Sequence, residues 1–328
     1  MKPTFIDFCA GIGSGRLGLE LSGFRCIAYS EINQDSIKTY EILHGSNEKN
    51  LGDLTKINIQ QLPNFDLMIA GFPCQTFSIA GLRKGFDDER GQIIYNLVNI
   101  LKAKQVKYFI LENVKGLVNH NKGQTLKTIL ELLNNANYDV NYNVFNSLDF
   151  NIPHMRERIY FIGIRKDLST YTNNFFFDNN IFDNYQKKFN NYLNIKNFLI
   201  DENNELNYKT INTFKNYLNN KYNCNKFNYD SLLKKDYLIL DTRQSDLRLY
   251  KNKVPTLRAG RQGILYVKNG KLKSITGYES LLLQGFPKHY ADKIKGKITN
   301  SKLLFQTGNA MTVNVIQYLG TTLLNFIK

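Results

Sequence analysis

Short apolar runs alternate with amphipathic stretches over the first 165 or so residues of the chain. The runs have the length of buried strands, and the stretches between them repeat hydrophobic side chains at helical spacing. Strands are expected at Thr4–Phe8, Cys26–Glu31, Asp66–Gly71, Tyr108–Glu112, Asn141–Val144 and Tyr160–Ile164. Helices are expected at Gly15–Leu21, Gln34–Leu43, Gln92–Lys102 and Gln124–Asn134. This alternation predicts an α/β fold with a doubly wound, mostly parallel sheet.

The pattern changes in the second half of the chain. Residues 173–241 are crowded with Asn, Lys, Tyr and Phe and lack a regular alternation of strand and helix. We interpret this region as part of a second, smaller domain, and a variable insertion without a binding role is the alternative. Near the end, Val315, Leu319, Leu323 and Phe326 recur at helical spacing, which predicts a last helix that packs on the first domain.

The composition is that of a folded protein with an anionic partner. Hydrophobic residues make up 42% of 328, and no apolar run approaches the ~20 residues that span a bilayer. The first residues lack a signal peptide, so we expect a cytoplasmic location. The chain has 43 Lys and Arg against 28 Asp and Glu, a net charge of +15, which favours a polyanion, although a solvated lysine surface is the alternative.

The chain has four cysteines, none of them in a C-x-x-C pair. They are Cys9, Cys26, Cys74 and Cys224. We therefore expect no metal site and no redox pair. Such scattered cysteines fit a reducing compartment.

A glycine-rich turn follows the first predicted strand. Its sequence is Asp7-Phe8-Cys9-Ala10-Gly11-Ile12-Gly13-Ser14-Gly15. Glycines let a ligand approach the backbone closely, and Glu31 after the second strand can bind ribose hydroxyls. The pair fits any nucleoside-containing cofactor, NAD included, and a turn that binds nothing is the alternative. Asp53 can accept from an adenine amino group, or it caps a short helix.

One cysteine stands on a loop at the edge of the sheet where ligands bind. Strand Asp66–Gly71 runs into Phe72-Pro73-Cys74-Gln75, a poor place for a core cysteine, whereas Cys9 and Cys26 fit buried positions. A thiol with a pKa of about 8.5 becomes a nucleophile where its neighbours favour the thiolate. The polar, glycine-containing segment 80–91 is predicted to form a lid over a ligand.

Charged residues end the neighbouring strands. Glu112 is expected beside Cys74, where a carboxyl group can hold or deliver a proton to a ring that the cysteine attacks. Arg156 and Arg158 precede another strand and would point to the same side in strand geometry. They can bind phosphate or a base edge, stabilise a thiolate, or form surface salt bridges.

These motifs, in this order and over most of the chain, resemble the cytosine-5 DNA methyltransferases of bacterial restriction–modification systems. The matching segments are the glycine turn, Glu31, Gly52-Asp53-Leu54, Gly71-Phe72-Pro73-Cys74-Gln75, Phe77-Ser78, Lys84-Gly85-Phe86, Arg90-Gly91, Glu112-Asn113-Val114, Arg156-Glu157-Arg158, Gln284-Gly285-Phe286-Pro287 and Gln306-Thr307-Gly308-Asn309-Ala310. The chain departs from the family pattern at Cys9, Ser14, Ile32, His154 and Ala310. None of these departures falls on Cys74, Glu112, Arg156 or Arg158.

The resemblance implies a two-domain enzyme with DNA bound between the domains. It places the catalytic and cofactor-binding domain at 1–168, completed by 299–328, and the target-recognition domain with a connecting segment at 169–298. The cofactor would be S-adenosyl-L-methionine. The Cys74 thiolate would attack C6 of a cytosine flipped out of the duplex, protonated Glu112 would bind near N3, and C5 would take the methyl group.

Site residues are expected in three groups. The catalytic group is Cys74, Glu112, Arg156 and Arg158. Cofactor contacts are expected at Phe8, Ala10, Gly11, Gly13, Glu31, Ile32, Asp53, Leu54, Phe72, Asn309 and Ala310. DNA contacts are expected at Ser78, Arg83, Lys84, Arg243, Gln244, Arg248, Arg258, Arg261 and Gln262. Arg can pair with guanine and Gln with adenine, although phosphate contact or a plain loop is an equal alternative for the last six of these.

We expect double-stranded DNA as the partner, a monomer acting on it, and a cognate restriction endonuclease as a candidate second partner. An NAD-dependent oxidoreductase would leave the Pro-Cys-Gln loop, the arginine pair and the basic charge unexplained. A methyltransferase acting on RNA is a nearer alternative, and the length of the 170–275 region favours DNA. An amino-group methyltransferase would carry an Asn/Asp-Pro-Pro-aromatic tetrapeptide, which is absent from this sequence.

Overall fold

The computed structural model of this chain describes residues 2–72, 92–168, 194–201 and 204–327. The chain divides into two compact units, each with its own sheet and apolar core. Unit 1 comprises residues 1–146, 157–190 and 311–328, and unit 2 comprises residues 147–156 and 191–310. The functional roles expected of the two domains stay predictions, and each unit is described by itself.

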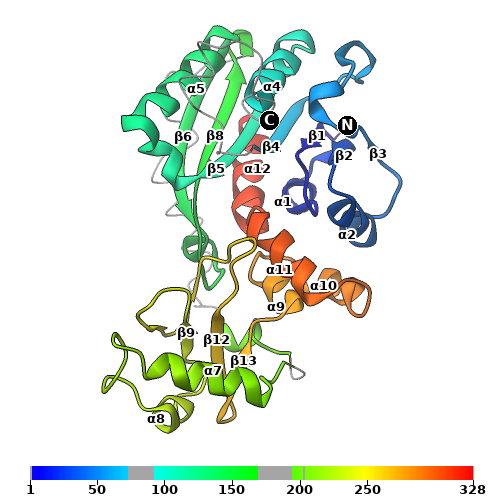
Figure 1. Ribbon diagram of the computed structural model, residues 1–328. Coiled ribbons are helices and arrows are strands. Elements are labelled where there is room, and N and C mark those ends of the chain that lie inside the picture. The colour runs from blue at the N-terminus through cyan, green and yellow to red at the C-terminus, as the bar shows by residue number, and fades with distance from the viewer. Residues whose placement is uncertain (1, 73–91, 169–193, 202–203, 328) are drawn as a thin grey trace. The chain divides into compact units, whose positions relative to one another are not determined.

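Unit 1 is built on a seven-stranded sheet with the order β3-β2-β1-β4-β5-β8-β6 (Figure 1). The strands are β1 Thr4–Phe8, β2 Arg25–Ser30, β3 Lys49–Asn50, β4 Leu67–Gly71, β5 Tyr108–Val114, β6 Tyr138–Asn146 and β8 Glu157–Arg165. Pairing is parallel from β3 through β5, and β8 runs antiparallel to both of its neighbours. Because β2 and β4 flank β1, the winding reverses between β1 and β4, the point where such sheets bind ligands.

Helices cover both faces of this sheet. They are α1 Ser14–Ser22, α2 Gln34–His44, α4 Gln92–Ala103, α5 Gln124–Asn135 and α12 Val313–Ile327. Leu97 of α4 and Ile129 of α5 share an apolar cluster with Met68 of β4. Gly15 of α1 lies against Ile69, the next residue of β4, whose side chain points to the opposite face. The expected doubly wound, mostly parallel sheet is therefore confirmed.

Three strands are longer than predicted. β6 and β8 each begin three residues earlier than expected, and β5 ends two residues later. The burial of β6 is interrupted along its length, since it lies at the sheet edge, and polar residues such as Asn141 and Asn143 break its apolar run. An edge strand exposes part of its surface to solvent, so polar residues occur along it. Its alternation of apolar and polar residues is therefore weak, although its backbone is paired along its whole length.

The C-terminal helix α12 packs on α1, as predicted. Val315, Leu319 and Leu323 are buried. A Cβ at Gly18 of α1 would lie 2.6 Å from the Cβ of Ile316 and 2.8 Å from the carbonyl oxygen of Val313. Gly18 thus allows two helices to approach closely. None of the helices in the described ranges, α12 included, has the length and apolar composition needed to cross a membrane.

Replacing Gly18 with alanine is expected to destabilise unit 1. Alanine is the better helix former by about 1 kcal/mol, but its methyl group would overlap α12, so we expect a net loss of about 2 kcal/mol in the free energy of unfolding. Urea denaturation followed by circular dichroism would measure it. Gly116→Ala is the control, because a Cβ there meets nothing within 4 Å. An unchanged midpoint for Gly18→Ala would contradict the close helix contact.

Unit 2 has a four-stranded antiparallel sheet with the order β10-β9-β12-β13. The strands are β9 Ile239–Asp241, β10 Arg248–Tyr250, β12 Ile264–Lys268 and β13 Lys271–Ser274, and a separate parallel pair joins β7 His154–Met155 to β11 Val254–Pro255. The helices are α7 Tyr208–Leu218, α8 Tyr229–Leu233, α9 Gly277–Leu282, α10 Lys288–Ile294 and α11 Asn300–Asn309. Phe214 and Leu232 pack with Leu240 and Val267, so α7 and α8 share a core with the sheet.

Short 3₁₀ helices connect several of these elements. They lie at Leu54–Lys56, Ile59–Gln61, Lys115–Val118, His120–Gly123, Ser147–Phe150, Lys166–Leu168 and Ile195–Asn197.

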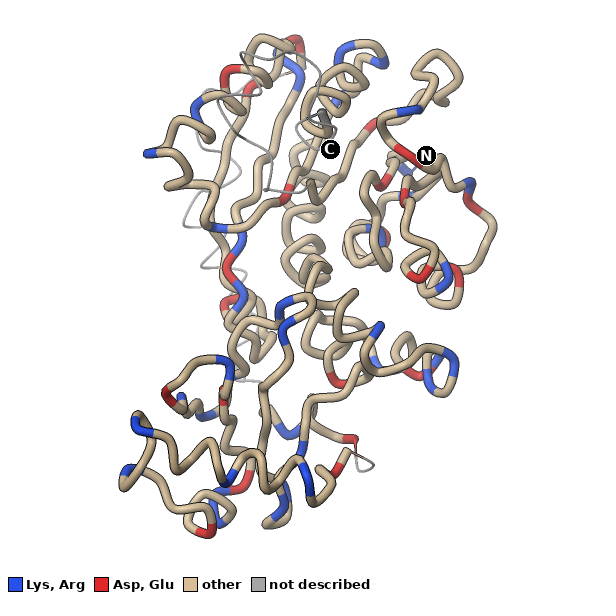
Figure 2. The backbone as a smooth tube through the Cα atoms, viewed as in Figure 1, with Lys and Arg blue, Asp and Glu red and all other residues tan. Residues whose placement is uncertain are grey.

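The net charge of the chain is concentrated in unit 2. Its sequence carries 22 Lys and Arg against 10 Asp and Glu, and that of unit 1 carries 21 against 18. The net charges are therefore +12 and +3. Figure 2 shows Lys and Arg distributed along the backbone of unit 2. Attraction to a polyanion is thus expected mainly from unit 2.

Candidate active site

The turn after β1 bends through three residues with positive φ. Cys9, Gly11 and Gly13 have φ values of 53°, 57° and 77°. This left-handed conformation suits glycine and costs about 1–2 kcal/mol at an L-residue such as Cys9. Gly13 is the N-cap of α1, so the turn delivers the chain directly to a helix N-terminus at the point where the sheet reverses its winding.

Buried polar groups support this turn. Oδ2 of Asp7 accepts the main-chain N–H of Arg16 at 3.1 Å, and burial raises the pKa of Asp7 well above its usual range. Nε2 of His44, the last residue of α2, lies 3.2 Å from the carbonyl oxygen of Ile12. A Cβ at Gly13 would come within 2.4 Å of that nitrogen. His44 was not expected at this site, because no local pattern links the end of α2 to the glycine turn.

Glu31 joins the end of β2 to the glycine turn. Its Oε2 accepts the N–H of Gly11 at 2.8 Å, and its Oε1 accepts the N–H groups of Ile32 and Asn33 at 2.8 Å each. The side chain of Asn50 pairs with the main-chain N–H and carbonyl of Glu31 at 3.1 and 3.0 Å. The carboxylate is thus fixed beside the turn, and Oε2 keeps an acceptor position for a ligand hydroxyl.

Most of the apolar residues expected to contact the cofactor are core residues. The buried ones are Phe8, Ala10, Leu54 and Phe72. Because their side chains are packed inside unit 1, a ligand would meet their main-chain atoms. Ile32, next to Glu31, is 64% exposed and offers an apolar surface.

Asp53 has the hydrogen bonds of a helix cap. Its Oδ1 accepts the N–H and the hydroxyl of Thr55 at 2.9 and 2.7 Å, at the start of the short helix Leu54–Lys56. These bonds lower the pKa of Asp53. The expected contact with an adenine amino group stays a prediction.

Strands β5 and β8 bring Glu112 and Arg158 together. Nε of Arg158 lies 3.0 Å from Oε1 of Glu112, and the two side chains are only 14% and 8% exposed. Glu112 pairs with Tyr160 across the antiparallel ladder, so Arg158 is its diagonal neighbour on the same face. A nearly buried ion pair therefore stands at the carboxyl end of β5, the ligand-binding edge of the sheet.

The chain passes beside this ion pair at the end of β4. The N–H of Phe72 donates to the carbonyl of Glu112 at 3.3 Å, and the side-chain amide of Asn113 donates to the carbonyl of Phe72 at 2.9 Å. Residues 73–91 lie outside the described residues, and with them Cys74, Ser78, Arg83, Lys84 and the expected lid. Their roles stay predictions.

The two cysteines of unit 1 that the structure describes are unsuited to nucleophilic chemistry. Burial raises the pKa of both Cys9 and Cys26 to about 12. Both are therefore thiols at neutral pH, and a thiol is a weak nucleophile. The third described cysteine, Cys224, is exposed in unit 2.

Arg156 has different partners from Arg158. It is 2% exposed, and its Nη1 donates to the carbonyls of Leu257 and Gly308 at 3.4 and 3.1 Å. Strand alternation does not relate the two arginines, because β8 begins only at Glu157. The bonds of Arg156 tie β7 to the end of α11, where Asn309 and Ala310 lie, and favour a role in holding that segment. Its expected catalytic role stays a prediction.

The arginines expected to contact DNA differ in exposure and in how tightly other residues hold their side chains. Arg243 forms a two-point ion pair with Asp241, Nε–Oδ1 and Nη2–Oδ2 both 2.7 Å, and donates to the carbonyl of Thr256 at 2.6 Å. Burial acts to raise the pKa of Asp241, but the hydrogen bonds from Arg243 lower it overall. These contacts oppose a base contact by Arg243. Arg248 is exposed and pairs with Asp246 at 3.4 Å.

The remaining DNA candidates of unit 2 are exposed. They are Gln244, Arg258, Arg261 and Gln262. Their contacts with DNA stay predictions.

A seven-stranded sheet with one antiparallel strand next to its edge, a glycine turn after β1 and an acidic residue after β2 defines the class of S-adenosylmethionine-dependent methyltransferases. Solved structures agree on the fold. The S. pombe Dnmt2 methyltransferase superposes with a TM-score of 0.73 at 19% identity over 100% of both chains. The Entamoeba histolytica methyltransferase EhMeth gives 0.70 at 19% identity over 100% of this chain and 99% of that one.

The chain belongs to the C-5 cytosine-specific DNA methylase family, whose model matches residues 3–325. It is 32% identical to the type II methyltransferase M.HhaI of Haemophilus parahaemolyticus, over 96% of this chain and 92% of that protein. It is 35% identical to the type II methyltransferase M.NgoBI of Neisseria gonorrhoeae, over 95% and 90%. The expected fold class and cofactor are those of this family and are confirmed, and membership of this family excludes an NAD-dependent oxidoreductase.

Some relatives match over only part of their length. The orphan methyltransferase M.Rho11sI of Bacillus phage rho11s is 44% identical over 170 residues, which is 51% of this chain and 34% of the phage protein. The chain thus aligns with about a third of that relative.

Proposed function

We propose that this protein transfers a methyl group from S-adenosylmethionine to C5 of cytosine in double-stranded DNA. The observation that carries the proposal is the nearly buried Glu112–Arg158 pair at the carboxyl end of β5, beside the strand end from which the Pro-Cys-Gln loop departs. The family match and the basic charge of unit 2 support it. Lys and Arg contacts to phosphates would supply affinity that falls with added salt.

The residues around the glycine turn fit this cofactor. Glu31 holds an acceptor oxygen where ribose hydroxyls can donate. A Cβ at Gly11 would meet nothing within 4 Å, so there is open space over the turn, and exposed Ile32 can cover one face of an adenine ring. These residues would hold the nucleoside. The bound cofactor supplies a methyl group made electrophilic by the sulfonium charge.

The protein's own groups would activate the cytosine. The thiolate of Cys74 forms a bond to C6 and pushes an electron pair toward C5 and N3. Glu112, which is ionised while it pairs with Arg158, must take up a proton before it donates at N3 and limits the charge that builds on the ring. Arg158 orients that carboxyl group through its Nε. Bonding of the methyl carbon to C5 would break its bond to the sulfonium sulfur, which leaves as a neutral thioether. Loss of the C5 proton to a base then expels the Cys74 thiolate, and the proton at N3 returns to Glu112 as the ring is restored.

Replacing Glu31 with alanine is expected to weaken cofactor binding selectively. The change removes the ribose acceptor and the bond to Gly11, a loss of about 2 kcal/mol, or roughly 30-fold in Kd. Isothermal titration calorimetry with S-adenosylmethionine would measure it. Glu41→Ala, on the exposed side of α2, is the control with equal loss of charge. Equal affinities in the two variants would remove Glu31 from the cofactor site.

Bisulfite sequencing tests the proposed activity itself. DNA from methylation-deficient cells expressing the chain should contain protected cytosines in one sequence context, and DNA from cells expressing Cys74→Ala should contain none. The same sequencing of cellular RNA addresses the alternative substrate. Protected cytosines in RNA alone would replace DNA with RNA in the proposal, and none in either nucleic acid would overturn it.

We further infer that one copy of the chain acts on DNA in the cytoplasm and protects sites that a cognate restriction endonuclease would cut. The names of two relatives, type II methyltransferases, support this setting, while the phage relative is named an orphan methyltransferase. Light scattering of the DNA complex would give the stoichiometry. Digestion of methylated and unmethylated DNA with an extract of the source cells would show whether an endonuclease of matching specificity exists.

A further inference from the structure

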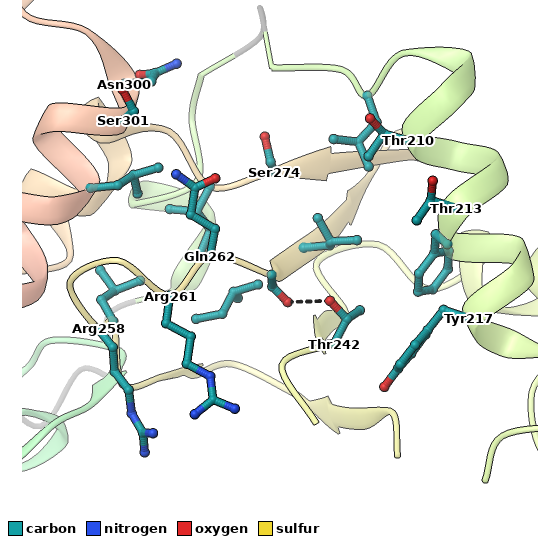
Figure 3. Close-up of a pocket in the computed structure, with 18 residues that line it drawn as sticks. Thr210, Thr213, Tyr217, Thr242, Arg258, Arg261, Gln262, Ser274, Asn300 and Ser301 are labelled. Atoms are coloured by element: carbon teal, nitrogen blue, oxygen red, sulfur yellow. Dashed lines mark hydrogen bonds between the residues drawn. The ribbon is translucent and has the colours of Figure 1, made fainter. Parts of the chain in front are cut away.

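Unit 2 contains a cavity of ≈ 640 Å³ whose lining includes three of the expected DNA contacts, Arg258, Arg261 and Gln262. Figure 3 shows Thr210, Thr213 and Tyr217 of α7 on one side of it, and Arg258 and Arg261 on another. Apolar side chains, among them Phe214 and Leu265, complete the lining together with the start of α11. All of the lining residues belong to unit 2.

The two arginines have no counter-ion among the described residues, and the side chain of one of them, Arg261, is held in place. Neither Arg258 nor Arg261 forms an ion pair with a carboxylate of the described residues, and both are exposed. The N–H of Arg261 closes a turn onto the carbonyl of Arg258 at 3.2 Å, with Gly260 at a φ of 70°. Nη2 of Arg261 donates to the carbonyl of Arg243 at 2.7 Å, which fixes its direction. Both arginines line the cavity, and no carboxylate of the part of the chain that the structure describes pairs with either of them.

The far end of the same turn is also anchored. Thr242 donates through its N–H and its hydroxyl to the carbonyl of Gly263, at 2.8 and 2.9 Å. A Cβ at Gly263 would lie 3.0 Å from the Thr242 hydroxyl oxygen, so the contact leaves no room for a side chain. The cavity wall that carries the arginines is therefore built in advance of any ligand.

The chemistry of the lining selects a ligand class. Two guanidinium groups favour a phosphate, and apolar walls favour a flat, weakly polar body. Hydroxyl groups of Thr213 and Ser274 can pair with polar atoms at the edge of that body. A volume of this size is typical of pockets for small molecules. A cavity cannot read bases in a groove of the duplex as an inserted helix does. It can bind a nucleotide that has left the base stack.

We propose that this cavity binds a nucleotide, with its phosphate on Arg258 and Arg261 and its base against Phe214 and Leu265. The site is separate from the glycine turn, which lies in unit 1. The nucleotide comes either from the DNA that the enzyme methylates, in which case the inference rests on the proposed function, or from a free mononucleotide. The two sources share one chemistry and are separated by experiment.

Binding of free nucleotides to the full chain tests the second source. Calorimetry would use the four deoxynucleoside monophosphates and, separately, inorganic phosphate. We expect Arg258→Ala/Arg261→Ala to weaken nucleotide binding at least 10-fold, whereas Lys234→Ala/Lys235→Ala, which loses the same charge from exposed positions, leaves it unchanged. Phosphate binding as tightly as the nucleotides would contradict a base site.

Binding of a target duplex, measured by fluorescence anisotropy, tests the first source. Thr213→Trp places a bulky ring at the cavity, and Asn216→Trp places the same ring on an exposed position of α7 that does not line it. We expect a loss in DNA affinity of at least 10-fold for Thr213→Trp and for the double arginine variant, with both controls near the unaltered protein. Cofactor affinity, measured in every variant, reports that the chain is folded.

The outcomes separate cleanly. Loss of mononucleotide binding alone identifies a free nucleotide, and loss of DNA affinity in Thr213→Trp as well as in the double arginine variant identifies a nucleotide of the substrate. Loss of DNA affinity in the arginine variant alone would mean phosphate contacts outside the cavity and would contradict the proposal. If the cavity variants match their controls in both assays, the cavity is not a nucleotide site. Methylation by the unaltered protein is measured first, so a chain that fails to methylate DNA would overturn the proposed function while the mononucleotide assay still decides the inference.

Discussion

Replacing Cys74 with alanine is expected to lower the rate of DNA methylation by about 10⁴-fold or more, the scale on which loss of an enzyme's nucleophile acts. Without the thiolate, C5 of cytosine is too weakly nucleophilic to take the methyl group. Transfer of tritiated methyl groups from S-adenosylmethionine to duplex DNA would measure the rate. Cofactor affinity should be unchanged, because the glycine turn and Glu31 are independent of the sulfur atom.

A matched control variant and a DNA substrate that prevents release of the enzyme strengthen this test. Cys224→Ala removes an exposed thiol of unit 2 and should leave the rate within a factor of two. A duplex with fluorine at C5 of the target cytosine has no proton to lose there, so the unaltered protein should remain bonded to it in denaturing gels. A Cys74→Ala protein that still forms this bonded complex would assign the nucleophile to another residue.

Replacing Glu112 with glutamine is expected to lower the methylation rate by about 10²- to 10³-fold, the usual contribution of a positioned acid. Glutamine keeps the size of the side chain and a donor near N3, but it cannot deliver a proton and it breaks the charge pair with Arg158. Single-turnover kinetics with saturating DNA and cofactor would isolate this step from binding.

Two comparisons decide whether the loss of methylation rate in Glu112→Gln depends on its ion pair with Arg158. Glu157→Gln, in the exposed pair with Lys115, should change the rate less than twofold. Arg158→Leu should also slow methylation, and the combination with Glu112→Gln should cost less than the sum of both, since the arginine acts through the carboxyl group. Fully additive losses in free energy would mean that the two residues act separately.

The proposed site gathers residues that are far apart in the chain because the sheet reverses its winding at β1. The glycine turn follows β1, Glu31 follows β2, the Pro-Cys-Gln sequence follows β4, and Glu112 lies two residues before the end of β5. In parallel strands these ends meet at one edge. Helices cover both faces of the sheet, and α12 packs directly on α1.

Much of this could be predicted from the order of residues alone. Apolar periodicity places strands and helices because backbone geometry and burial repeat with fixed periods of two and 3.6 residues. The positions of Glu31 and Glu112 at strand ends followed from that pattern, and so did the buried face of α12. The ends of β6 were less clear, since polar side chains on this edge strand weaken the period. The start of β8 was also less clear, because it begins with the charged residues Glu157 and Arg158.

The sequence by itself determined the class of fold, the family motifs and the strand ends on which Glu31 and Glu112 stand, because these depend on local period and chain order. Only the tertiary structure decided which charges meet. Arg158 pairs with Glu112, buried Arg156 bonds to Gly308, and Arg243 is held by Asp241. A side chain's hydrogen-bond partners are set by which distant segments fold against it, and the three arginines are alike in sequence until their partners are known.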